Sequence, residues 1–365
     1  MTFSEIDHRH MRRALELAAR GQGHVEPNPM VGCVIADGNE VLAEGWHGKF
    51  GEAHAEVDAL QRLSEPAGSA TMYITLESCC HRGKTPPCTD AIRKSGITRV
   101  IVAAEDPFQE VAGQGMATLR AAGVHVTCGL LSTRSQALNA PYLRLVQKSR
   151  PWVIAKWAMT LDGKLATRER NSQWISNAAS REIVHRLRGR MDAIVVGSGT
   201  VETDDPLLTA RPAGPRIATR VVLDSPANLA AESQLVQTAS DVPVLVVAGP
   251  HAAEQAQQRL RDAGCEIFQT TEDHRLDEVL NELGRRQFTN ILVEGGSQIL
   301  GSFFAARAVD EVHVFVAPKL VGGAEALSPV AGHGISDMAS AIGFSSSNIE
   351  IVGDNVYISG RLDTT

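Results

Sequence analysis

The sequence predicts an α/β protein of two domains. With 365 residues the chain is too long for one domain of ordinary size, and its 43% hydrophobic and 21% charged residues are typical of a globular protein. Short apolar strands alternate with helices in the first half, which predicts a three-layer arrangement. The apolar strands of the second half lack polar alternation, which indicates a mostly parallel sheet covered on both faces.

The first half begins with a helix that Ser4 and Asp7 open in the pattern of a capping box and that Gly21 ends. The turn 37–39 joins two strands of a hairpin. Runs of apolar residues then predict the remaining elements, which are strands at 31–36, 40–45, 71–76, 99–103 and 124–128 and helices at 54–63, 88–95 and 116–122.

The basic stretch 142–150 looks like the join between the halves, so we expect domains at 1–146 and 147–365. A helix at 178–190 precedes the strand 193–200. The loop 200–206 follows the carboxyl end of that strand, where open α/β sheets bind ligands. Other buried strands are expected at 152–157, 220–224, 244–248, 290–294 and 311–317.

One imidazole and two thiols form the candidate metal site of the first half: His54, Cys79 and Cys88. They suit a tetrahedral zinc and leave its fourth position free for water, which is the stoichiometry of a catalytic site. Glu56 is not needed as a ligand and can carry the protons of that water. Taken singly, a His-x-Glu pair is usually solvated and cysteines are often small core residues. Their combination in this order, with His-x-Glu ahead of the cysteines, is the signature of zinc nucleobase deaminases.

Charge and cysteine content limit the partners. A net charge of −7 argues against a surface that binds nucleic acid, so we expect a small-molecule partner. No apolar run is long enough to span a membrane and the first residues lack a signal-peptide core, so we expect a cytoplasmic protein. Six cysteines are too few for a disulfide scaffold, and we expect Cys33, Cys128 and Cys265 to lie in the core.

Polar residues outside the metal site suggest ligand contacts. Asn28 stands between two prolines in a rigid turn, where it either reads a base edge or caps the turn. The loop with His81, Lys84 and Thr85 could hold a phosphate, although a solvated loop is the default alternative. The paired glycines 295–296 between a strand and a helix either admit a phosphate to backbone N–H groups or form only a tight turn.

With these motifs in view, nearly the whole chain resembles the bifunctional riboflavin-biosynthesis proteins, in which a pyrimidine deaminase is fused to a uracil reductase. The nine positions from Cys79 to Cys88 are the most discriminating feature, because related deaminases have a short Cys-x-x-Cys. The resemblance implies a cytidine-deaminase-like first domain and a dihydrofolate-reductase-like second domain. The stretches that carry it are 27–32, 51–56, 79–88, 156–164, 172–175, 200–206 and 294–296.

The resemblance also implies cofactors and roles. One Zn²⁺ in the deaminase domain would be held by His54, Cys79 and Cys88, and Glu56 would shuttle the proton as ammonia leaves. NADPH would reduce the ribosyl group to ribityl in the second domain, and a homo-oligomer, a dimer or tetramer, is usual in the family. Substrate positions are Asn28, His47, His81, Lys84, Thr85, Ser172, Arg188, Leu208, Arg211 and Glu294. Cofactor positions are Ala158, Trp174, Thr200, Asp204, Ser225, Gly296, Ser297, Gln298, Ile299, Leu300, Gly301 and Ser302.

The sequence departs from the family pattern at Ser78 and Cys80, and it is compatible with two other functions. Ser78 stands where the family usually has proline, which relaxes the approach to Cys79 but removes no ligand. Cys80 is an alternative ligand, although Cys79 keeps the spacing to Cys88. The alternatives to the bifunctional enzyme are a pyrimidine-phosphate-binding protein without turnover and a deaminase/reductase for another base.

Overall fold

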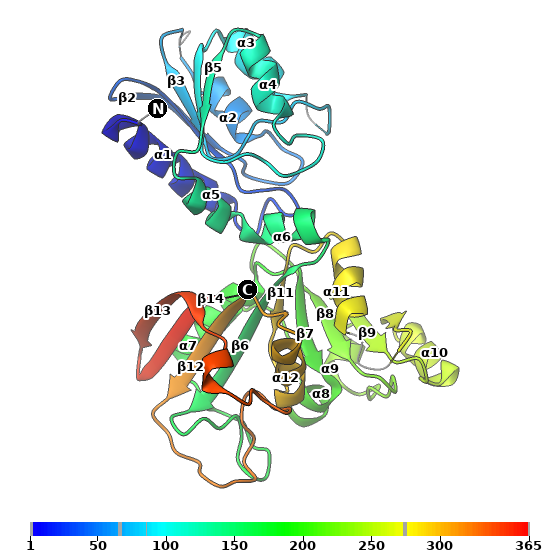
Figure 1. Cartoon of the computed structure of the whole chain (residues 1–365). Coiled ribbons are helices and arrows are strands. Elements are labelled where there is room, and N and C mark those ends of the chain that lie inside the picture. Colours follow the sequence, from blue (N-terminus) through cyan, green and yellow to red (C-terminus); the bar gives the residue numbers. More distant parts are fainter. Residues whose placement is uncertain (1–2, 65–67, 85, 273–275, 364–365) are drawn as a thin grey trace. The chain divides into compact units, whose positions relative to one another are not determined.

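The structure is a computed structural model, and it describes residues 3–64, 68–84, 86–272 and 276–363 (Figure 1). Contacts divide the chain into two units, Met1–Ser149 and Arg150–Thr365. The division lies beyond the expected 146/147 boundary because the stretch expected to join the domains forms helix α6 (Ala140–Lys148). Within the described residues, no helix combines the length and the apolar composition needed to cross a membrane.

The first unit is built on a five-stranded sheet of order β2-β1-β3-β4-β5. β1 pairs antiparallel with both β2 and β3, whereas β3, β4 and β5 are parallel. Its elements are α1 (Glu5–Ala18), a 3₁₀ turn (Ala19–Gly21), β1 (Gly32–Asp37), β2 (Glu40–Trp46), α2 (Ala55–Gln61), β3 (Thr71–Ile74), α3 (Cys88–Ser95), β4 (Arg99–Val102), α4 (Gln114–Ala121), β5 (His125–Cys128), α5 (Ser132–Leu138) and α6.

Apolar side chains on both faces of this sheet create the three layers. Those of α2, α3 and α4 pack on one face around Ile35, Met72 and Val100. Those of α1 pack on the other face around Val34 and Tyr73. The three-layer prediction is confirmed, but Cys128 is exposed at the end of the edge strand β5 and not in the core, since no further strand covers it.

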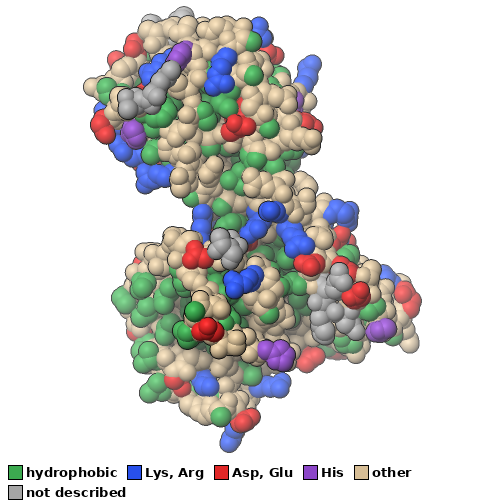
Figure 2. Space-filling model, viewed as in Figure 1, with side chains coloured by type: hydrophobic (Ala, Val, Ile, Leu, Met, Phe, Trp, Pro, Cys, Tyr) green, Lys and Arg blue, Asp and Glu red, His purple; other side chains and the backbone are tan. Residues whose placement is uncertain are grey.

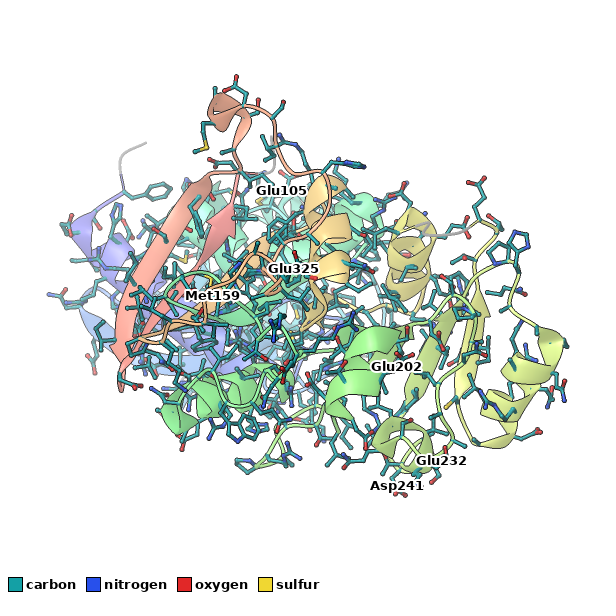
Figure 3. The ribbon with its side chains drawn as sticks, turned by 90° about the horizontal axis from the view of Figure 1, so that it is seen from below. Glu105, Met159, Glu202, Glu232, Asp241 and Glu325 are labelled. Carbon is teal, nitrogen blue, oxygen red and sulfur yellow. The ribbon has the colours of Figure 1, made fainter. Side chains whose placement is uncertain are left out.

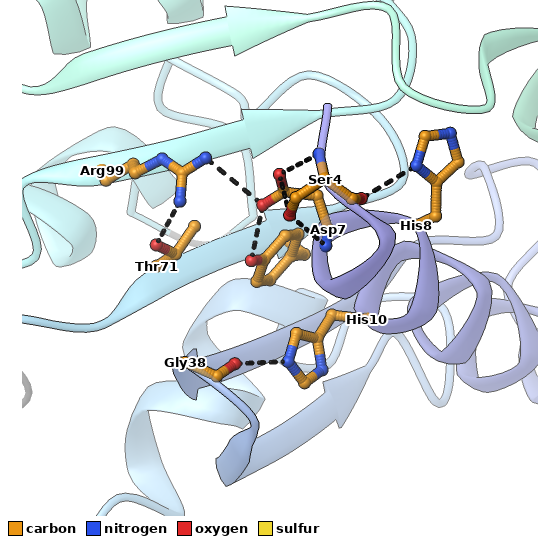
Figure 4. A network of polar contacts seen from close by, with 8 residues as sticks. Ser4, Asp7, His8, His10, Gly38, Thr71 and Arg99 are labelled. Atoms are coloured by element: carbon orange, nitrogen blue, oxygen red, sulfur yellow. Dashed lines mark hydrogen bonds and ion pairs between the residues drawn. The ribbon is translucent and has the colours of Figure 1, made fainter. Parts of the chain in front are cut away.

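The capping box of α1 is confirmed, and its Asp7 also contacts residues of the sheet (Figure 4). The backbone nitrogen of Asp7 donates to Ser4 Oγ at 3.2 Å, and that of Ser4 donates to the Asp7 carboxylate at 2.8 Å. The Tyr73 hydroxyl and the Arg99 guanidinium donate to the same carboxylate at 2.9 and 3.2 Å. Burial opposes the charge, but these hydrogen bonds and Arg99 prevail and lower the pKa of Asp7. Asp7 therefore ties α1 to β3 and β4.

The second unit is built on a nine-stranded sheet of order β10-β9-β8-β7-β11-β6-β12-β14-β13. Its strands are β6 (Trp152–Thr160), β7 (Ala193–Gly197), β8 (Thr219–Leu223), β9 (Val244–Ala248), β10 (Glu266–Gln269), β11 (Asn290–Val293), β12 (Glu311–Ala317), β13 (Phe344–Val352) and β14 (Asn355–Leu362). Its helices are α7 (Ala178–Arg188), α8 (Ser198–Asp204), α9 (Gln234–Gln237), α10 (Glu254–Asp262), α11 (Leu276–Arg285) and α12 (Ser297–Ala305), with a 3₁₀ turn at Met338–Ser340.

The predicted sheet, mostly parallel and covered on both faces, is confirmed for the seven strands from β10 to β12, which are parallel. Helices α7, α9 and α10 cover one face and α11 and α12 the other. The apolar residues of 349–358 predict one strand near the C-terminus, but the chain turns between Val352 and Asn355 and forms the antiparallel hairpin β13–β14 at one edge of the sheet.

One boundary prediction is wrong in an instructive way. The strand expected at 193–200 ends at Gly197, and residues 198–204 form α8 instead of strand followed by loop. Gly197 stands at the N-cap of α8 with extended backbone, so the chain turns from strand to helix with no intervening loop. The turn places Thr200 at the carboxyl edge of the sheet.

Candidate active sites

Three side chains far apart in sequence meet at one point of the first unit. Nδ1 of His54 lies 3.5 Å from Cys79 Sγ and 3.3 Å from Cys88 Sγ. One ligand atom from each of the three residues lies within 4.8 Å of the others. Among the described residues this group does not include Cys80, whose thiol donates instead to the carbonyl oxygen of Glu110 at 3.6 Å.

Two helix N-termini and one strand end bring these ligands together. His54 is the N-cap of α2, Cys88 is the first residue of α3, and Cys79 follows β3. The backbone nitrogen of Cys88 also donates to Cys79 Sγ at 3.3 Å. Helix α2 reaches the sheet because Gly45 carries no side chain, since a Cβ there would lie 2.3 Å from the backbone nitrogen of Ala59. The ligand positions are therefore set by regular elements and their ends.

The donor set and its spacing fit zinc. Zinc bonds to sulfur at about 2.3 Å and to nitrogen at about 2.0–2.1 Å, so neighbouring ligand atoms of a tetrahedron lie about 3.5 Å apart. The two sulfur–nitrogen distances above match that spacing. A hydrogen bond from the Cys88 thiol, opposed by burial and supported by His54, lowers the pKa of Cys79 to about 4. Cys79 is therefore ready to act as a thiolate ligand.

Glu56 is the second residue of α2, and its side chain is buried, with 3% exposed. Burial, followed by the charge on Cys79, raises the pKa of Glu56, while His54 acts in the opposite direction. A carboxyl group with a raised pKa binds a proton more readily, which suits a group that must both take and return one. Its position in the first turn of α2 keeps it beside His54 without making it one of the three ligands.

Asn28 and His47 form a short hydrogen-bonded chain beside the metal ligands. The Asn28 amide nitrogen lies 3.2 Å from Nε2 of His47, and Nδ1 of His47 lies 3.0 Å from the carbonyl oxygen of Ala53. Because a carbonyl can only accept, Nδ1 donates to Ala53 and Nε2 accepts from Asn28. Burial lowers the pKa of His47, which favours this neutral form. These hydrogen bonds fix the Asn28 amide, and its side-chain carbonyl oxygen has no hydrogen-bond partner in the part of the chain that the structure describes.

The loop between the two sulfur ligands is placed less tightly. Lys84 Nζ lies 3.9 Å above the ring of Phe50, a cation–π contact. His81 packs against Phe108 with ring centroids 6.0 Å apart, and its Nε2 lies 3.8 Å from the Glu110 carboxylate. The prediction for Thr85 lies outside the described residues.

Two buried polar residues support this site, and no sequence motif pointed to them. The Glu77 carboxylate accepts the backbone N–H groups of Gly113 and Met116, each at 2.9 Å. The Asn139 amide accepts the N–H of Met30 at 2.8 Å and donates to its carbonyl at 2.9 Å. They fasten the segments that carry Cys79 and Asn28. A lone buried polar residue carries no signal in one sequence, so only the fold reveals these two.

The second unit contains a cavity of about 1850 Å³ at the carboxyl ends of its parallel strands. All the second-half positions that the sequence pointed to line it. These are Ala158, Ser172, Trp174, Arg188, Thr200, Asp204, Leu208, Arg211, Ser225, Glu294 and the run from Gly296 to Ser302. The cavity is large enough for a dinucleotide and a second small molecule.

The paired glycines at the start of α12 are required by close packing. A Cβ on Gly295 would lie 3.2 Å from Thr200 Oγ1, and Gly296 has φ +78, a value that favours glycine. A Cβ on Gly197 would lie 2.9 Å from the Ile299 side chain. The bare backbone leaves the N-terminus of α12 open to the cavity, where N–H groups can receive a phosphate. These residues therefore fit a dinucleotide cofactor.

A buried cluster of charges lies at one side of the cavity. Arg188 donates to both oxygens of Glu294, at 2.5 and 2.8 Å, and Lys156 Nζ lies 3.8 Å from the same carboxylate. Burial opposes ionisation of Glu294, but Arg188 and then Lys156 prevail and lower the pKa of Glu294. Lys156 is not among the predicted site residues, although it is a lone lysine in the expected apolar strand 152–157.

Other contacts hold the walls of the cavity. The Ser172 hydroxyl donates to the Asp204 carboxylate at 3.0 Å, which joins a predicted substrate position to a predicted cofactor position. The Arg181 guanidinium lies 4.6 Å above the ring of Trp174, and Trp174 is 63% exposed. An exposed indole stacked on a guanidinium presents its other face to a ligand.

Comparison with known families matches both units. The cytidine and deoxycytidylate deaminase zinc-binding region matches residues 4–104, and the RibD C-terminal domain matches residues 151–353. Among curated proteins, the riboflavin biosynthesis protein RibD of Actinobacillus pleuropneumoniae is 38% identical over 98% of this chain and 95% of its own length. The RibD of Escherichia coli K12 is 35% identical over 96% of this chain and 98% of its own.

Solved structures give the same result. Acinetobacter baumannii RibD aligns with a TM-score of 0.87 at 32% identity and covers 98% of this chain and 99% of its own. A diaminohydroxyphosphoribosylaminopyrimidine deaminase/5-amino-6-(5-phosphoribosylamino)uracil reductase from Thermotoga maritima aligns with a TM-score of 0.85 at 33% identity, covering 98% of each chain. Both similarities extend through the two units.

Proposed function

Because this chain belongs to the RibD family of riboflavin biosynthesis proteins, we infer that it catalyses two successive reactions. The first unit is a zinc-dependent deaminase that hydrolyses an amino group from diaminohydroxyphosphoribosylaminopyrimidine. The second unit is an NADPH-dependent reductase that acts on the product, 5-amino-6-(5-phosphoribosylamino)uracil. We assign residues up to Ser149 to the deaminase and residues from Arg150 to the reductase, in accord with the compact units.

His54, Cys79 and Cys88 would hold the zinc of the deaminase. A bound zinc ion supplies acidity, since it lowers the pKa of a bound water to about 7. The Glu56 carboxylate takes the proton of the attacking water and returns it to the nitrogen that leaves as ammonia. Its burial and raised pKa suit both transfers, because the group holds the proton between them.

The substrate of the deaminase would be oriented by neutral groups near the base and by charged groups near the phosphate. Asn28 accepts from the base edge through the carbonyl oxygen that its contact with His47 leaves free. His81 and Lys84 lie on the loop between the sulfur ligands and suit the ribose phosphate, and we keep the same role for Thr85 from the sequence alone, since it lies outside the described residues. The neutral state of His47 keeps charge away from the base.

NADPH would occupy the cavity of the reductase and supply hydride to the ribosyl group. The N-terminus of α12 would receive a phosphate of the cofactor, and Thr200 and Ser225 line the same cavity. Lys156, Arg188 and Glu294 form the polar floor on which the substrate is oriented. The side chains proposed to contact the cofactor are Ala158, Trp174, Thr200, Asp204, Ser225 and Gly296 through Ser302, and those for the substrate are Ser172, Arg188, Leu208, Arg211 and Glu294.

The observation that carries this function is the His54–Cys79–Cys88 group with buried Glu56 beside it. A protein that only binds the pyrimidine phosphate would not need three zinc ligands with a buried proton carrier beside them. We expect the zinc-loaded chain to release ammonia from the diaminopyrimidine and then to oxidise NADPH. Removing the zinc with a chelator should abolish ammonia release but leave oxidation of NADPH by the supplied uracil intermediate unchanged. Ammonia release that persists without metal would contradict the deaminase assignment, and failure to oxidise NADPH would contradict the reductase assignment.

We also propose that the protein is a homo-oligomer joined through β13. This strand ends the nine-stranded sheet, so among the described residues no further strand pairs with its outer edge, and its residues Phe344 to Ile351 are exposed. Ile349 and Ile351 are 65% and 72% exposed, and Figure 2 shows hydrophobic side chains gathered over the edge where β13 lies. Replacing both isoleucines with serine should reduce the molar mass measured by light scattering to that of one chain. An unchanged oligomer would exclude this edge.

A cytoplasmic location is the remaining proposal. Every cysteine lies within the described residues and is free, and the site needs Cys79 and Cys88 as thiolates. A reducing compartment keeps such a pair from oxidising. Fractionation of cells that express the protein should recover it with the cytoplasmic proteins.

A further inference from the structure

His185 is a cavity residue to which no sequence motif pointed. It lies on α7 one turn before Arg188, and its side chain lines the cavity of the reductase unit. Its Nδ1 lies 3.3 Å from the backbone nitrogen of Arg211 and 3.2 Å from the carbonyl oxygen of Thr209. The ring therefore contacts the loop that carries Arg211.

The contact with Arg211 selects one form of the ring. Nδ1 can accept from the Arg211 N–H or donate to the Thr209 carbonyl, but that carbonyl already accepts from the Arg188 guanidinium at 3.3 Å. The arrangement that pairs every group has Nδ1 accepting from Arg211, and a neutral ring then carries its proton on Nε2. The other tautomer would donate to Thr209 and leave the Arg211 N–H without this acceptor. Burial, followed by the charges of Arg188 and Arg211, lowers the pKa of His185 and favours the neutral ring. Nε2 has no hydrogen-bond partner among the described residues, so its N–H is available to a ligand.

The surroundings of His185 favour an anionic ligand. The charged groups that face it are Arg188, Arg211 and Glu294. Glu294 is held by Arg188 through two hydrogen bonds, whereas the Arg211 guanidinium is exposed at the cavity wall and has no ion-pair partner within the described chain. His185 thus faces the two positive charges of Arg188 and Arg211 and the one negative charge of Glu294, so the net charge around it is positive. The substrate proposed for this unit brings one strongly anionic group, its phosphate.

We propose that His185 binds the phosphate of the reductase substrate, donating its Nε2–H to a phosphate oxygen while Nδ1 holds the Arg211 loop. The phosphate would lie between His185 and the Arg211 guanidinium. This proposal rests on the proposed function, because that function supplies the phosphoribosyl substrate.

Two variants separate the two nitrogens of the ring. His185→Asn keeps an acceptor near Nδ1 and removes the donor at Nε2, whereas His185→Gln keeps a donor near Nε2. We expect the asparagine variant to raise KM for 5-amino-6-(5-phosphoribosylamino)uracil by about tenfold, because a hydrogen bond to a charged group is lost. The glutamine variant should stay within about threefold of the wild type. NADPH affinity and thermal unfolding should be unchanged in both, which verifies that the reductase unit is folded.

The dephosphorylated substrate provides the decisive comparison. With it, wild type and His185→Asn should have the same KM, because the lost donor has no phosphate to bind. If the asparagine variant keeps the wild-type KM for the phosphorylated substrate, or if its defect persists with the dephosphorylated one, the proposal is wrong. Activity of the wild-type chain is measured first, so failure of the proposed reductase function is distinguished from failure of the His185 assignment.

Discussion

Glu56→Gln is expected to lower kcat for ammonia release by about 10²–10⁴-fold, with zinc still bound. Glutamine has the shape of glutamate but cannot take a proton from water and return it to the leaving nitrogen. Glu56 is 3% exposed, so no bulk water or buffer base can replace it at the same position. Zinc content should be unchanged, because His54, Cys79 and Cys88 supply the three ligands without it. Ammonia release and metal analysis of the same sample measure both quantities.

Two comparisons make this result specific. Glu105→Gln changes an exposed carboxylate of the same unit (Figure 3) and should retain wild-type deamination. Oxidation of NADPH by supplied 5-amino-6-(5-phosphoribosylamino)uracil should be unaffected in Glu56→Gln, since the reductase is a separate compact unit. Ammonia release by Glu56→Gln at more than a tenth of the wild-type rate would assign the proton transfer to another group.

The deaminase site could be predicted because its chemistry is encoded in residue types at local spacings. His54 and Glu56 are two positions apart at a helix start, Cys88 is the first residue of a helix, and Cys79 follows a strand by a few residues. Strand and helix patterns place such ends without knowledge of the fold. Even so, the convergence of the three ligands within 4.8 Å depends on how α2, α3 and β3 pack, which one sequence does not state.

Residues that act through long-range contacts could not be predicted. Asn139 holds Met30 across 109 positions of sequence, and Lys156 meets Glu294 only because β6 and β11 are neighbours in the sheet. The hairpin β13–β14 could be predicted only in part, as one strand at 349–358. Strand β13 is exposed along both faces, so it lacks the buried apolar pattern on which strand prediction depends.

The second large effect is expected for Glu294→Gln, which should destabilise the reductase unit by about 3 kcal/mol and lower its kcat by about 10²-fold. The carboxylate is 4% exposed and is the counter-ion of both Arg188 and Lys156. Glutamine leaves two buried cations without a negative charge. Burial lowers the pKa of Lys156 and so favours its neutral form, which places the expected cost near the lower end of the range for a broken buried pair.

The loss of stability in Glu294→Gln should depend on pH. The pKa of Glu294 is lowered in the folded chain, so its charge stabilises the fold above the ordinary glutamate pKa of about 4.3 and this contribution is lost as the pH falls through the lowered value. The difference in unfolding free energy between wild type and Glu294→Gln should therefore be largest near neutral pH and shrink at acidic pH. Urea unfolding of the reductase unit in the full chain, followed at neutral and at acidic pH, measures this difference in free energy.

Glu232→Gln, at an exposed carboxylate of the same unit (Figure 3), is the control and should change neither stability nor activity. A Glu294→Gln chain as stable as this control at neutral pH would mean that the three charges are not coupled as the fold implies.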